Sequence, residues 1–154
     1  MNIESIKKSL KELSFQKNNM NWGLFIVSLC LLVGTSWITT YAGNQLLEVP
    51  PFENIARTAS LFNVIGSLTL VPVIEELIFR KYLVSLLQRF FSWKISVGIS
   101  SMIFAILHWQ KNFFPFLING LIYSFTMKKS GTIVMPIMLH MSYNFVAVIS
   151  QYIQ

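Results

Sequence analysis

The stretch VPVIEELIFRKYLV, residues 71–84, places four charged side chains in the middle of an apolar run. Glu75 and Glu76 are adjacent, and Arg80 and Lys81 follow them within two helical turns. A charge inside a membrane helix costs about 2.5–3.5 kcal/mol even on the lenient insertion scale, and ionisable residues kept at that cost mark functional sites by default. This stretch therefore indicates both the class of fold and the place where chemistry is to be sought.

The composition around this stretch is that of a membrane protein. Of the 154 residues, 54% are hydrophobic and 12% are charged, and the mean hydropathy is +0.58. Soluble domains carry about 25% charged residues. The net charge of +6 resides mainly in the N-terminal tail and between apolar runs, which is typical of loops near anionic headgroups and does not indicate nucleic-acid binding. The single cysteine, Cys30, excludes an intrachain disulfide.

The apolar runs predict an all-α fold, a polytopic membrane helix bundle of about five transmembrane helices. Pro72 is expected to break or kink the second helix near residues 69–71, because proline removes a backbone donor. Whether the second run crosses the membrane once or twice stays open. The expected spans are residues 20–41, 58–91, 94–109, 113–127 and 132–153, with an extramembrane loop over 42–57.

Residues 1–19 are predicted to form an amphipathic helix on the membrane surface, ahead of a membrane-embedded domain over residues 20–154. The distribution of cations predicts the orientation. With the N-terminus in the cytoplasm, eight cations lie inside and two outside, leaving out Arg80 and Lys81 within the apolar stretch. The positive-inside rule favours this direction if residues 58–91 cross once.

Helix geometry separates the roles of the two glutamates. Glu76 and Arg80 are four residues apart, so they share a helix face and can pair. Glu75 points about 100° away, which leaves its carboxylate comparatively free to act as a general base on water. The alternative is a buried ion-pair network of all three side chains that only locks helices together.

The two histidines of the chain also lie in apolar spans. His108 stands at the end of SSMIFAILHW, where a single histidine is more often a polar residue at headgroup level. His140 and Asn144 are one helical turn apart, and two polar side chains in a span need partners. Together with the glutamates, these groups offer what amide hydrolysis requires: a base, a group that positions water, and donors for the oxyanion.

Three short motifs resemble those of one known family. EELIFR at 75–80, FAILH at 104–108 and HMSYN at 140–144 are similar to the EExxxR, FxxxH and HxxxN motifs of the CAAX-protease and bacteriocin-processing family of intramembrane peptidases. The motifs occur in the family's order and in separate spans, and the resemblance covers about residues 65–150.

The resemblance implies a role for each matching residue. Glu75 would activate the water and His108 would help to hold it, while His140 and Asn144 would stabilise the tetrahedral oxyanion. The supporting residues would be Glu76, Arg80 and Phe104.

The metal question stays open at this stage. The family is often labelled metal-dependent, and zinc, if bound, would be held by Glu75, His108 and His140. The chain has no HExxH spacing, so the favoured mechanism depends on glutamate and requires no cofactor.

The predicted function is therefore an intramembrane endopeptidase of a bacterial plasma membrane, in bacteriocin self-immunity or peptide processing. Its expected partners are membrane lipids and a secreted peptide or lipid-tethered protein substrate. Two departures from the family are Lys81, where relatives often have glycine, and the short chain. Either the chain is a minimal core, or a partner or second copy (a homo-oligomer) completes the site. The alternatives are a non-catalytic immunity or scaffold protein and a small transporter, the latter disfavoured because no inverted repeat is detectable.

Overall fold

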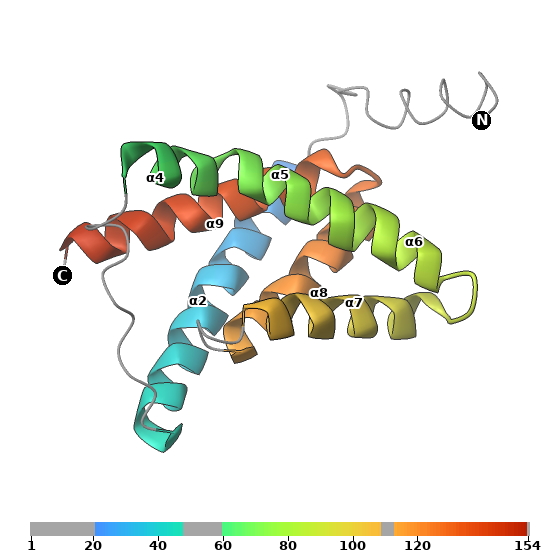
Figure 1. Ribbon diagram of the computed structural model, residues 1–154, viewed down its shortest axis with the longest axis horizontal. Coiled ribbons are helices and arrows are strands. Elements are labelled where there is room, and N and C mark those ends of the chain that lie inside the picture. The colour runs from blue at the N-terminus through green and yellow to red at the C-terminus, as the bar shows by residue number, and fades with distance from the viewer. Residues whose placement is uncertain (1–20, 48–59, 109–112, 154) are drawn as a thin grey trace.

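The computed structural model describes residues 21–47, 60–108 and 113–153, and in this part of the chain all regular structure is helical (Figure 1). This agrees with the predicted all-α membrane helix bundle. The elements are α2 (Trp22–Leu47), α4 (Leu61–Leu68), α5 (Leu70–Glu76), the π-helix η1 (Leu77–Leu83), α6 (Val84–Leu87), α7 (Trp93–Leu107), α8 (Phe113–Ser130) and α9 (Val134–Ile153).

Helices α4, α5, η1 and α6 join into one long rod that carries the charged stretch (Figure 1). The rod is interrupted at Thr69, whose backbone leaves helical geometry at φ −125° and ψ −73°, three residues before the buried Pro72. The predicted kink near residues 69–71 is thus confirmed. The rod is otherwise continuous from Leu61 to Leu87.

The first span extends beyond its predicted end. Its apolar part covers Trp22–Ala42, close to the predicted 20–41, but α2 continues to Leu47. The prediction of a loop was therefore wrong for residues 42–47, because the end of an apolar run marks the end of the lipid-facing part and not of the backbone hydrogen bonding. The predicted surface helix at 1–19, the rest of that loop and the connection at 109–112 lie outside the described residues.

Helix α8 is the centre of the bundle. It packs against α2, α7, α9 and η1. Small side chains permit the closest of these approaches: a Cβ added at Gly120 would lie 2.9 Å from both Cβ and Oγ of Ser101 on α7. Small residues serve the same purpose in membrane helix pairs generally, where close backbone approach replaces the hydrophobic effect as the source of attraction.

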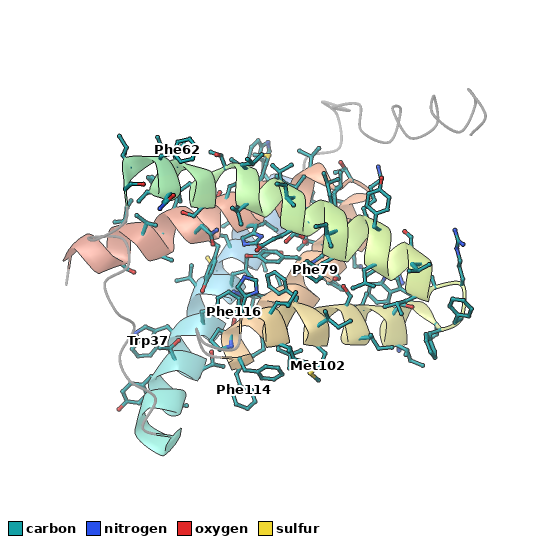
Figure 2. All side chains as sticks on the ribbon, viewed as in Figure 1. Trp37, Phe62, Phe79, Met102, Phe114 and Phe116 are labelled. Carbon is teal, nitrogen blue, oxygen red and sulfur yellow. The ribbon has the colours of Figure 1, made fainter. Side chains whose placement is uncertain are left out.

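The distribution of side chains suits a lipid environment. Large apolar residues cover the outside, among them Trp37 and Phe62, which are 71% and 84% exposed (Figure 2). Inside the bundle, buried polar residues lie among buried apolar ones such as Leu32 and Leu139, and a buried hydrogen bond joins Ser36 on α2 to Asn119 on α8 at 3.3 Å. An apolar exterior of this extent marks a surface that meets lipid or a partner and not water.

Two segments of the described chain are long and apolar enough to cross a bilayer. They are Trp22–Ala42 and Leu61–Leu87, with mean hydropathies of 1.8 and 1.7. Trp93–Leu107 and Val134–Ser150 are apolar but shorter. The spans predicted at 94–109, 113–127 and 132–153 correspond to α7, α8 and α9.

Replacing Gly120 by alanine should destabilise the protein, whereas the same change at Gly98 should not. Both substitutions gain about 1 kcal/mol of helix propensity, but only the methyl group at Gly120 meets Ser101, and overpacking costs about 1–3 kcal/mol. Nothing lies within 4 Å of the corresponding position at Gly98. Thermal unfolding in detergent should therefore give a lower midpoint for Gly120→Ala than for Gly98→Ala. Equal midpoints would contradict the close approach of α7 and α8.

Candidate active site

The two glutamates lie where the rod changes from an α-helix to a wider π-helix. Glu75 and Glu76 end α5, and Arg80 lies in η1. A buried hydroxyl fixes the wide segment, since Ser100 on α7 donates to the carbonyl oxygen of Phe79 at 2.8 Å. Single π-helical turns recur at functional sites, because they rotate the following side chains relative to those before them.

Glu76 is fully buried and holds two partners at once. Its Oε2 lies 3.2 Å from Nε of Arg80, as the spacing of four residues predicted. Its Oε1 accepts a hydrogen bond of 2.9 Å from Nδ1 of His140. A carboxylate in the apolar interior requires such compensation for its lost hydration. Glu76 thereby ties α9 to the rod.

Glu75 faces both histidines. Its Oε1 lies 3.4 Å from Nε2 of His108, and its Oε2 lies 3.7 Å from Nε2 of His140. The side chains of Glu75 and His108 are 18% and 19% exposed, against 6% for His140 and none for Glu76. The structure thus brings together residues 75, 108 and 140 from three helices, with Glu75 on the accessible side of the cluster.

The hydrogen bond made by Nδ1 of each imidazole determines whether the Nε2 atom that faces Glu75 carries a proton. Nδ1 of His108 lies 2.8 Å from the carbonyl oxygen of Phe104, which only accepts hydrogen bonds, so the geometry assigns the proton to Nδ1. Nδ1 of His140 donates to Glu76 in the same way. In neutral rings, both Nε2 atoms therefore present lone pairs towards Glu75. At 3.4 and 3.7 Å these separations exceed a direct hydrogen bond, and a proton donor is needed among the three acceptors.

Aromatic rings hold the imidazoles in place. Phe116 on α8 stacks on His108 with centroids 4.5 Å apart and an angle of 10°, and Figure 2 shows it inside the bundle. Tyr123, two turns further along α8, stacks on His140 at 4.8 Å and 20°. Phe104 lies between them, with the guanidinium carbon of Arg80 4.4 Å above its ring. The stacking leaves each imidazole little freedom to rotate.

Asn144 lies towards the kink of the rod. Its Nδ2 donates to the carbonyl oxygen of Ser67 at 3.0 Å, in the last turn of α4 before Thr69. An amide group has two N–H donors, so this bond leaves the second one available. Of the four residues predicted to act in catalysis, Glu75, His108 and His140 thus lie together. The fourth, Asn144, is hydrogen-bonded to the backbone beside the kink.

The same cluster was predicted as the zinc site if a metal is bound. Among the described residues, no group of three or more His, Cys, Asp or Glu side chains has an arrangement that could hold a metal ion. The zinc site at Glu75, His108 and His140 stays a prediction, and the proposed mechanism uses protein groups and water.

A family model, Type II CAAX prenyl endopeptidase Rce1-like, matches residues 57–146, which is more than half of the 154-residue chain. The chain belongs to this family. No curated protein and no solved structure matches it. The matched range contains all three motifs, from Glu75 to Asn144.

Membership establishes the kind of protein. The Rce1-like family is membrane-embedded, and its function is of the CAAX-type intramembrane protease kind. The family resemblance drawn from the motifs is thereby confirmed. It also fits the apolar exterior of the bundle and the polar cluster at its centre.

Four residues of the site were missed by the sequence analysis. Phe116 and Tyr123 are seven residues apart, so a helical pattern would have placed them on one face of α8, but nothing in the sequence shows which helix that face meets. Ser67 takes part through its backbone carbonyl, which no side-chain pattern reveals. Ser100 takes part through its hydroxyl, which donates to a backbone carbonyl of η1, a contact that depends on how α7 packs against the rod.

Replacing Arg80 by methionine should strongly destabilise the bundle. The change leaves Glu76 buried without its cation, and breaking a buried pair in this way costs about 3–5 kcal/mol. The neighbouring Lys81→Met is the control, since Lys81 is partly exposed and has no place in this cluster. Thermal unfolding in detergent should show a large loss for Arg80→Met and a small one for Lys81→Met. Adding Glu76→Gln to Arg80→Met should restore part of the loss; no restoration would contradict the pairing.

Proposed function

We propose that this chain is an intramembrane endopeptidase in which Glu75 activates the hydrolytic water. The observation that carries the proposal is the arrangement of Glu75 against two imidazole nitrogens whose other ring nitrogens are already engaged. The Glu75 carboxylate and the two Nε2 atoms are all hydrogen-bond acceptors. A water molecule between them supplies the protons that these hydrogen bonds need. Glu75, the most accessible carboxylate of the cluster, takes a proton from that water.

The reaction then proceeds through a tetrahedral intermediate. The water oxygen attacks the carbonyl carbon of the scissile peptide bond while its proton passes to Glu75. The developing oxyanion is stabilised by N–H donors, after which the C–N bond breaks and Glu75 returns the proton to the leaving amine. His108, fixed by the Phe104 carbonyl and the Phe116 ring, orients the water through Nε2.

His140 and Asn144 are the proposed donors to the oxyanion. Asn144 has one amide N–H beyond the one bound to Ser67. His140 donates through Nε2 while that atom holds the water's proton, which passes to it from Glu75 at 3.7 Å and returns to Glu75 before the amine leaves. Glu76 and Arg80 hold His140 and the rod in register and do not touch the reacting atoms.

The substrate is proposed to be a membrane-associated or secreted peptide, or a lipid-tethered protein. The cluster lies within apolar helices whose outer faces are covered by large hydrophobic side chains, so a substrate must reach it from the bilayer or its surface. The proposed setting is a bacterial plasma membrane with the N-terminus in the cytoplasm, which places eight cations inside and two outside. Bacteriocin self-immunity or peptide processing is the proposed biological role.

Replacing Glu75 by glutamine should abolish cleavage without unfolding the protein. The amide keeps the size of the side chain but cannot accept the water's proton, and the loss of a general base typically lowers turnover by about 10²–10⁴-fold. Purified protein in liposomes would be tested on hydrophobic and lipidated peptides, with peptide fragments measured by mass spectrometry. Ser101→Ala is the matched control, because Ser101 is a buried polar side chain of α7, the helix that ends at His108, and has no hydrogen-bond partner among the described residues.

Normal cleavage by Glu75→Gln would overturn the mechanism. An immunity or scaffold protein without catalysis would behave differently from a peptidase in cells. It would protect against a bacteriocin equally well with Glu75→Gln and with His140→Ala, whereas a peptidase would lose protection with both.

Removal of metal ions by a chelator tests whether peptide cleavage requires only protein groups and water. Dialysis against 1,10-phenanthroline should leave the rate of peptide cleavage unchanged under the proposed mechanism. A rate that falls on dialysis and returns with added zinc would assign a metal to Glu75, His108 and His140 instead.

A further inference from the structure

A cavity lies at the end of the bundle where α6, the start of α7, the end of α8 and the turn before α9 meet. Its volume is about 250 Å³, and its lining includes Val84, Trp93, Ser124 and Gly131. Neither Glu75 nor either histidine lines it, so it is distinct from the reaction centre. One residue, Arg80, belongs to both.

Arg80 brings unused hydrogen-bond donors to this cavity. The residue is only 2% exposed, and Nε faces Glu76, but Nη1 and Nη2 have no hydrogen-bond partner among the described residues. The faces of the guanidinium are covered by Phe104 at 4.4 Å and Tyr123 at 5.3 Å, which leaves its N–H edge for an acceptor. Buried donors without acceptors are costly, so such a group marks a place for an oxygen-rich ligand.

A second cation and three uncharged polar side chains also line the cavity. Lys128 lines the cavity with Nζ 3.8 Å from the ring centroid of Trp93. Ser85, Gln88 and Ser124 add hydroxyl and amide groups, and no carboxylate is among the described residues that line the cavity. Two cations, further hydroxyl and amide groups and no carboxylate are the recognition elements of a phosphate group.

The apolar part of the lining and the position of the cavity indicate which phosphate compound it binds. Val84, Val97 and Met127 make part of the lining apolar, which suits a ligand with hydrocarbon next to its charge. The turns at this end also carry Arg89 and Lys94, and under the proposed orientation they lie at the cytoplasmic leaflet, where anionic lipids gather.

We propose that this cavity binds the phosphate headgroup of an anionic phospholipid, held between Arg80 and Lys128. The inference goes beyond the peptidase activity and does not depend on it. Because Arg80 also pairs with Glu76, which holds His140, a bound headgroup contacts a side chain that supports the reaction centre. The lipid is thus a candidate structural ligand of the fold.

The test compares Lys128→Met with Lys129→Met. Lys129 is the adjacent cation; it lies over Phe125 and does not line the cavity, so the two variants lose the same charge from the same turn. Full-length protein in neutral detergent would be titrated with phosphatidylglycerol, and bound lipid would be counted by native mass spectrometry. Phosphatidylcholine and inorganic phosphate are the comparison ligands.

We expect saturable binding of phosphatidylglycerol over phosphatidylcholine, weakened about tenfold by Lys128→Met and hardly changed by Lys129→Met. Lys128→Arg should retain binding, which separates a lost contact from a misfolded variant. Equal effects of the two methionine variants, or equal binding of the two lipids, would overturn the site. Full displacement of lipid by millimolar inorganic phosphate would overturn the assignment to a lipid and indicate a soluble phosphate.

Discussion

The carboxylate of Glu76 is the interaction on which the rest of this structure depends. It is fully buried, and each of its two oxygens has one partner, Arg80 within the rod and His140 on α9. A buried pair of this kind contributes little net stability over an apolar core, yet it is costly to break. Its effect is therefore specificity: the bond between Oε1 and His140 fixes where α9 lies against the rod, and the same placement brings His140 to Glu75.

A polar cluster inside a helix bundle requires close packing around it. In this chain, small residues and aromatic side chains provide that packing. Ser101 and Gly120 let α7 and α8 approach closely, so that Phe104 and Tyr123 meet Arg80 from two helices. Large apolar side chains cover the outside, and inside the bundle the polar cluster lies beside an apolar core that includes Leu32, Met135 and Leu139. The buried hydrogen bonds and ion pairs are therefore shielded from competition with water.

Much of this arrangement was predictable from the sequence, for reasons that particular residues make clear. The Glu76–Arg80 pair follows from helical spacing, and the kink at Thr69 follows from Pro72, because both are local. The bond from His140 to Glu76 was not predictable, since it depends on how α9 lies against the rod, 64 residues away in the chain. The loop expected at residues 42–47 failed for a different reason, because polarity ends a span without ending a helix.

The division of labour between the glutamates follows from the same geometry. Each histidine has one nitrogen occupied, His108 by a backbone carbonyl and His140 by Glu76, so both rings turn Nε2 towards Glu75. Adjacent residues on a helix cannot share a face, and this is why one carboxylate can be buried in an ion pair while its neighbour stays accessible. A single glutamate could not perform both tasks: paired with Arg80 and His140 it is fully buried away from water, and placed where water can reach it, it leaves His140 and Arg80 without their common partner.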